Sequence, residues 1–182
     1  SGNNVAQGYH VINALRRYVE DYRRVRSNHS WCSPLKVLSL ASNGFEQGNA
    51  VEAILSMLEN NALGLTSLNL SKNGVSSENG LLHQALLRVI QRNTVLIELN
   101  LSGNRLCGDF LDSLFSAMGA DESKLNLTFL RIEDNVPALS DTHLEQLDRI
   151  MERSRIERVK KYFYRKNVQS QAEDYPIDFQ YG

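Results

Sequence analysis

Four segments of the chain repeat one template, and this repeat constrains the fold more than any other feature of the sequence. Each segment reads L-x-x-L-x-L-x-x-N, with Ile132 at one leucine position of the fourth segment. The segments begin at Leu35, Leu65, Leu96 and Leu127, so successive first leucines are 30, 31 and 31 residues apart. Such a period is typical of proteins in which each unit buries its apolar face against the next unit. The 182 residues are therefore expected to form a linear stack of units.

Each unit contains the pattern of a short strand and then that of a helix. The alternating leucines predict a strand with one buried face, and the Asn that ends the template can hydrogen-bond the backbone where the chain turns away. Apolar residues at i, i+3, i+4 and i+7 then predict one amphipathic helix in each unit. The apolar helix positions are Val51, Ile54, Leu55 and Leu58; Leu82, Ala85, Leu86 and Val89; Leu111, Leu114, Phe115 and Met118; and Leu144, Leu147 and Met151.

A strand template followed by a full helix resembles the leucine-rich repeats of the ribonuclease-inhibitor-like class, over residues 35 to about 155. This resemblance implies an α/β solenoid, shaped like a horseshoe, with short parallel strands on the concave face and helices on the convex face. The segments NNALGLTSLNLSKNGVSS and RNTVLIELNLSGNRL are also similar to the repeat domains of tropomodulins and of related actin-regulating proteins such as CARMIL. The closer resemblance implies an actin or cytoskeletal regulator.

Four regions follow from the repeat. Residues 1–30 are expected to form a capping helix, because Val11, Leu15, Tyr18 and Tyr22 make an apolar stripe before the first strand. Residues 31–155 hold the four repeats. Residues 156–167 form a basic cap, in which the template begins again at Ile156 as a degenerate fifth strand, and residues 168–182 form a tail rich in acidic and aromatic residues.

The formal net charge of −1 conceals a segregated distribution of charges. Residues 1–30 carry +3, residues 31–148 carry −7, residues 149–166 carry +6 and residues 167–182 carry −3. Such asymmetry bears on partners and association and not on the fold. It is compatible with contacts within the chain or with head-to-tail self-association.

The first candidate binding surface is the sheet face that the leucines leave open. The positions between the leucines are expected to form three rows across the strands. The rows are Val37, Ser67, Glu98 and Phe129; Ser39, Asn69, Asn100 and Arg131; and Ala41, Ser71, Ser102 and Glu133.

Only the fourth strand combines an aromatic residue, a cation and an anion, a mixture typical of protein-binding hot spots. The alternative is that Phe129 packs on a flanking loop and that Arg131 and Glu133 form a solvated pair. The candidate partner-binding residues here are Glu98, Asn100, Phe129, Arg131 and Glu133.

The second candidate surface is the basic stretch 149–166, where arginines and lysines alternate with aromatic residues. Its candidate binding residues are Arg158, Lys160, Lys161, Tyr162 and Tyr164. This composition suits a nucleic acid or an anionic lipid surface. The alternative is a solvated cap that faces a helix C-terminus and the acidic repeats, and the acidic repeats disfavour general nucleic-acid binding.

The third candidate is the tail, whose expected anchors are Tyr175, Ile177, Phe179 and Tyr181. Acidic residues interleaved with these side chains are typical of a short linear motif, and the tail is expected to bind this domain or a neighbouring copy. The alternative is that the tail is ordered only by contacts in a crystal.

The sequence contains no pattern that is typical of catalysis, metal binding or membrane insertion. The four histidines lie in different units, and the chain has no C-x-x-C, no phosphate-binding glycine loop and no G-x-S-x-G. No run approaches the length of a membrane helix and no signal peptide precedes the repeats, while Cys32 and Cys107 suit reduced thiols. We therefore expect an intracellular, cytoplasmic, non-enzymatic scaffold that binds a protein partner without a cofactor, a metal or a small-molecule substrate.

Overall fold

The computed structural model describes residues 3–28, 35–45, 49–59, 61–76, 78, 80–120, 126–135 and 140–156. Its elements alternate between helix and strand along the chain. They are α1 (Asn3–Asn28), β1 (Val37–Ser39), α2 (Asn49–Glu59), β2 (Ser67–Asn69), α3 (Gly80–Arg92), β3 (Glu98–Asn100), α4 (Gly108–Ala120) and β4 (Phe129–Arg131). A further helix covers residues 141–156.

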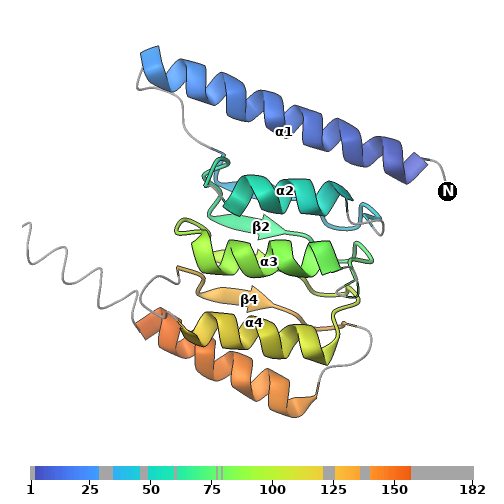
Figure 1. The fold of residues 1–182 in the computed structure, drawn as a ribbon, viewed down its shortest axis with the longest axis vertical. Helices are drawn as coiled ribbons and strands as arrows, with labels where there is room; N and C mark the ends of the chain where they lie inside the picture. Colours follow the sequence, from blue (N-terminus) through green and yellow to red (C-terminus); the bar gives the residue numbers. More distant parts are fainter. Residues whose placement is uncertain are drawn as a thin grey trace, which may run out of the picture.

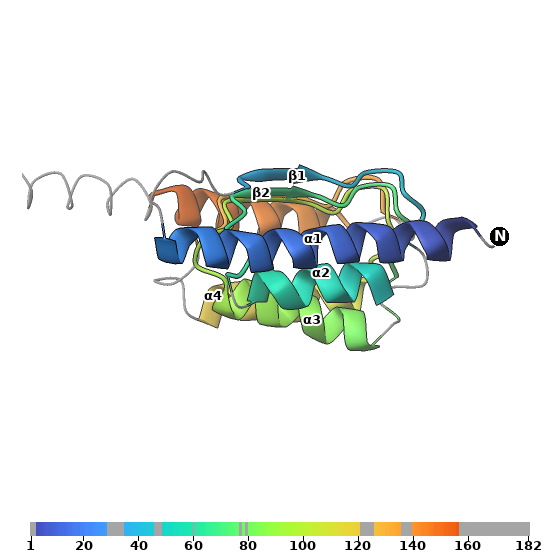
Figure 2. The same ribbon diagram turned by 90° about the horizontal axis from the view of Figure 1, so that it is seen from above.

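The strands form one parallel four-stranded sheet in the order β1-β2-β3-β4. Successive units stack side by side, so that α2, α3 and α4 cover one face of the sheet (Figure 1). Seen from the α1 end, strands and helices form separate layers (Figure 2). The structure thus confirms an α/β fold with parallel strands. The horseshoe curvature and the ribonuclease-inhibitor-like class stay predictions.

The core lies between the sheet and the helices and consists of the residues that the repeat pattern selects. The predicted apolar positions of α2, α3 and α4 are all at most 1% exposed. Leu144 is an exception in the helix over 141–156, where Leu147 and Met151 are buried but Leu144 is 38% exposed. His143 faces α4 instead, with its ring centroid 6.4 Å from that of Phe115. The predicted burial of Leu144 was therefore wrong.

The template asparagines form a buried ladder behind the sheet. Asn104 Oδ1 accepts hydrogen bonds from the backbone N–H groups of Asn73 and Val75 at 3.0 and 3.1 Å. Its Nδ2 donates to Leu70 O and Leu101 O at 3.1 and 2.8 Å. Asn73 and Asn135 bond in the same way to their own and the preceding unit. The predicted turn role is confirmed, and the ladder also joins neighbouring units.

The helix α1 packs beside α2 at the β1 end of the stack (Figure 1). Leu15 is buried as predicted, and so are Ile12 and Val19, which the predicted stripe does not include. The Tyr18 hydroxyl accepts the backbone N–H of Leu35 at 2.5 Å, which ties the helix to the start of the first repeat.

Candidate functional site

The open face of the sheet carries the predicted rows of side chains. The strand register aligns Val37, Ser67, Glu98 and Phe129 in one row, and Ser39, Asn69, Asn100 and Arg131 in the next. Both rows match the prediction, because a single parallel register relates each strand to its neighbour. The middle leucines of β2, β3 and β4 are buried on the other face, in the core, and Leu38 of β1 is partly buried against it.

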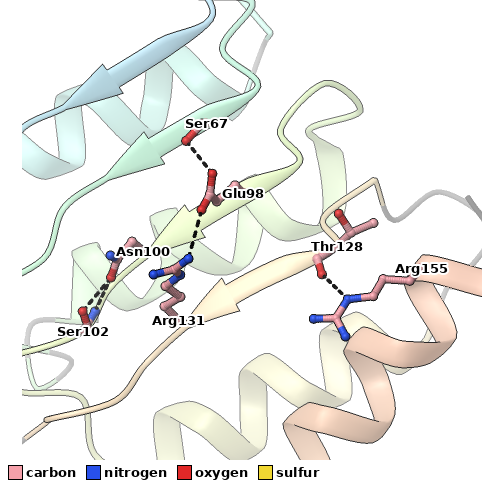
Figure 3. A network of polar contacts seen from close by, with 7 residues as sticks. All are labelled: Ser67, Glu98, Asn100, Ser102, Thr128, Arg131 and Arg155. Atoms are coloured by element: carbon pink, nitrogen blue, oxygen red, sulfur yellow. Dashed lines mark hydrogen bonds and ion pairs between the residues drawn. The ribbon is translucent and has the colours of Figure 1, made fainter.

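A chain of polar contacts crosses three strands on this face (Figure 3). The Ser67 hydroxyl donates to Glu98 Oε2 at 3.0 Å, and Glu98 Oε1 lies 3.8 Å from Arg131 Nη2. The Arg131 side chain is 58% exposed. Arg131 is therefore paired across the sheet with Glu98, and not with Glu133 as the solvated-pair alternative supposes.

Phe129 lies at the β4 end of its row and is 44% exposed. The guanidinium carbon of Arg155, from the helix over 141–156, lies 4.9 Å from the centroid of the Phe129 ring. This cation–π contact connects the exposed ring to the last described helix. Arg155 was predicted as part of the basic stretch but not as a neighbour of the sheet face, since no local motif connects it to a strand 26 residues earlier.

Arg155 also binds a backbone carbonyl at the β4 edge of the sheet. In each of the first three units, one backbone carbonyl accepts two N–H groups from the following unit. Lys36 O accepts from Thr66 and Ser67. Thr66 O accepts from Ile97 and Glu98, and Ile97 O accepts from Thr128 and Phe129. The equivalent carbonyl of the last unit, Thr128 O, accepts from Arg155 Nε at 3.2 Å (Figure 3). Ile156, where the template was expected to begin again, lies in the helix, and the rest of the predicted fifth strand lies outside the described residues. An arginine side chain, rather than a strand at Ile156, binds this edge acceptor.

The remaining predicted residues of the face are Asn100 and Glu133. Asn100 Oδ1 accepts the backbone N–H and the hydroxyl of Ser102 at 3.0 and 2.7 Å (Figure 3). Glu133 is exposed, and its carbonyl accepts the N–H of Gly103 at 2.9 Å. The face thus brings together all five residues predicted for it.

The basic stretch is described only as far as residue 156. Two ion pairs lie on the same helix: Arg149 Nη2 is 3.3 Å from Glu145 Oε2, and Arg155 Nη1 is 3.4 Å from Glu152 Oε2. These carboxylates offset part of the positive charge. The predicted binding residues of this stretch and the tail anchors lie outside the described residues: Arg158, Lys160, Lys161, Tyr162, Tyr164, Tyr175, Ile177, Phe179 and Tyr181.

A polar cluster connects the helix over 141–156 to α4, and its Asp112 member lies far from the other two residues in the sequence. Ser140 Oγ lies 2.8 Å from His143 Nδ1, and His143 Nε2 lies 3.4 Å from Asp112 Oδ1 on α4. The Ser140 hydroxyl also accepts the backbone N–H of His143 at 3.3 Å, as a helix N-cap does. The cluster therefore caps the helix over 141–156 and connects it to α4.

Among the described residues, no group of three or more His, Cys, Asp or Glu side chains is placed to hold a metal ion. Within the same ranges, every helix is too short or too polar to cross a membrane.

Comparison with known proteins identifies solved structures of similar fold. The actin-binding site 2 domain of leiomodin-1 superposes with a TM-score of 0.51 and 14% sequence identity, covering 75% of this chain and 88% of that domain. The tropomodulin C-terminal domain from Caenorhabditis elegans gives a TM-score of 0.47 at 17% identity, with coverage of 80% and 98%. No protein-family model matches the chain, and no curated protein matches its sequence. The leiomodin-1 likeness shows a shared fold.

Proposed function

We propose that this chain is a non-enzymatic protein-binding module that binds its partner on the open sheet face, at the β4 end. The observation that carries the proposal is the half-exposed Phe129 ring, which is held under the Arg155 guanidinium beside the Arg131–Glu98 pair. Aromatic and arginine side chains are enriched at the centres of protein interfaces.

The rigidity of the face supports the same proposal. The strands share one register, and the asparagine ladder fixes the turns behind them. A preorganised surface loses little conformational entropy when a partner binds. Contacts of Arg131 with Glu98 and of Arg155 with Thr128 O also limit the freedom of two long side chains.

A second, more specific candidate is an actin or cytoskeletal regulator. It is supported by the likeness to a leiomodin-1 domain whose name records an actin-binding site, and by the similarity of the repeat segments to those of tropomodulins. At 14% identity a shared fold does not carry the binding residues over, so actin remains one candidate partner of the face.

The proposal is tested by affinity capture with the wild type and the double variant Phe129→Ala/Arg131→Ala. The matched control is Leu144→Ala/Arg149→Ala, which removes an exposed apolar residue and an exposed arginine from the helix over 141–156. We expect the face variant to lose a partner that the wild type and the control retain. Equal capture by all three proteins would refute the proposal. Co-sedimentation of the same three proteins with actin filaments then decides between actin and another partner.

A further inference from the structure

We infer that the open sheet face binds an extended acidic and aromatic peptide segment, and that residues 173–182 of this chain are its intramolecular occupant. The inference rests on the proposed function, because the tail would occupy the face assigned to the partner. The tail would then compete with that partner for the face.

The amide groups of the second row are oriented as hydrogen-bond donors. Asn69 Oδ1 accepts the backbone N–H of Ser71 at 3.0 Å, and Asn100 Oδ1 accepts the N–H of Ser102 at 3.0 Å. A backbone N–H can only donate, so each contact fixes which end of the amide is the oxygen. The Nδ2 groups of Asn69 and Asn100 are therefore the ends left to bind a ligand. Among the described residues, none accepts a hydrogen bond from either group.

Arg131 extends this row with a charged donor. Its guanidinium carries five N–H donors, and its contact with Glu98 is long, at 3.8 Å. Asn69, Asn100 and Arg131 lie side by side on β2, β3 and β4. A row of two amide donors and a guanidinium suits carboxylate and carbonyl oxygens.

The neighbouring row has apolar side chains at its two ends. Val37 on β1 is 64% exposed and Phe129 on β4 is 44% exposed. Ser67 and Glu98 lie between them and are bonded to each other. A ligand for both rows must present carboxylates on one side and apolar or aromatic groups on the other.

Residues 173–182, Glu-Asp-Tyr-Pro-Ile-Asp-Phe-Gln-Tyr-Gly, have this chemistry. Side chains of an extended chain alternate between two sides. In an extended tail, Asp174 and Asp178 would share one side, whereas Tyr175, Ile177 and Phe179 would share the other. Residues 167–182 carry −3, so their charge complements the donor row.

The tail is long enough to reach the face from the last described helix. The last described residue of that helix is Ile156, beside the β4 edge where Arg155 contacts Thr128 O. Asp174 lies 18 positions after Ile156, and a chain of this length spans up to about 60 Å when extended. The sheet is only about 14 Å wide between β1 and β4, at about 4.8 Å for each neighbouring pair of strands.

The test is site-specific photo-crosslinking in the full chain, with p-benzoylphenylalanine in place of Phe179. We expect adducts mapped by mass spectrometry to lie on β2, β3 and β4, at a yield independent of protein concentration. Arg131→Glu is expected to lower the yield about tenfold, the size of effect that one charge-assisted contact has on an equilibrium. The control Arg149→Glu makes the same charge change on an exposed arginine of the helix over 141–156 and is expected to leave the yield unchanged.

Three outcomes would overturn the inference: adducts elsewhere in the chain, an Arg131→Glu yield equal to that of the control, or adducts only between two molecules at a yield that rises with concentration. The last result would assign the face to the tail of a second copy. Circular dichroism of each variant shows that it is folded. Partner loss in the Phe129→Ala/Arg131→Ala variant without tail adducts would refute this inference alone, whereas tail adducts without any partner would refute the proposed function alone.

Discussion

Replacing Asn104 with alanine tests the buried asparagine ladder that holds the units together. Asn104 is 2% exposed and makes four backbone hydrogen bonds of 3.1 Å or less, two as acceptor and two as donor. At about 1 kcal/mol for each bond, and with buried partners left unpaired, Asn104→Ala is expected to lower the free energy of unfolding by about 4 kcal/mol. Few single substitutions have so large an effect.

Asn100 provides the matched control, because it is the same residue type four positions earlier. It lies half-buried on the open face, and among the described residues its side chain bonds only to Ser102. Water can replace these contacts, so Asn100→Ala is expected to cost about 1 kcal/mol or less. Asn104→Asp keeps the side-chain volume but loses both donors, and we expect it to destabilise at least as much as Asn104→Ala. Urea unfolding of all four proteins measures the differences. Equal losses for Asn104→Ala and Asn100→Ala would refute the reasoning.

Three further substitutions test other features by unfolding and solution mass. Gly103→Ala is expected to cost about 2 kcal/mol, because Gly103 has a φ of 65° and its added Cβ would lie 2.9 Å from Lys72 Cγ; an unchanged stability would contradict this. Lys72→Gly, at a φ of 56°, is expected to raise stability by about 0.5 kcal/mol, since relief of the left-handed conformation exceeds the entropy cost of glycine; a loss would contradict it. Arg155→Ala is expected to lower the free energy of unfolding by about 1 to 2 kcal/mol, because it removes the bond to Thr128 O and the contact with Phe129. The same variant is expected to associate through the β4 edge, which sedimentation velocity would detect. A stable, monomeric variant would show that Arg155 does not protect the edge.

The sequence was sufficient to predict the repeated core and the rows of the sheet face. Both follow from a template whose periods are those of a strand and a helix, so local spacing determines which side chains point inward. Glu98, Phe129 and Arg131 could be aligned in advance because one register relates all the strands. The ion-pair partner of Arg131 could not be predicted, because its long side chain can reach either Glu98 or Glu133.

The features that sequence reasoning missed depend on contacts between units. Arg155 reaches Thr128 and Phe129 only because the last helix packs beside β4. His143 takes the inward position expected for Leu144 because the space beside Gly108 and Phe115 accepts its ring. No periodicity within one unit contains this information. The helix α1 differs from the repeats for the same reason, because it packs beside α2 where a preceding repeat would otherwise lie.

The most direct test of the central claim is photo-crosslinking from the binding face itself. The full chain would carry p-benzoylphenylalanine in place of Phe129, and a second version would carry it in place of Leu81, which is 66% exposed on the helix layer. Both would be illuminated in a cell extract, and the adducts would be identified by mass spectrometry. The account predicts a specific protein adduct from position 129 that is absent from position 81. The same adducts from both positions, or a specific adduct only from position 81, would contradict it.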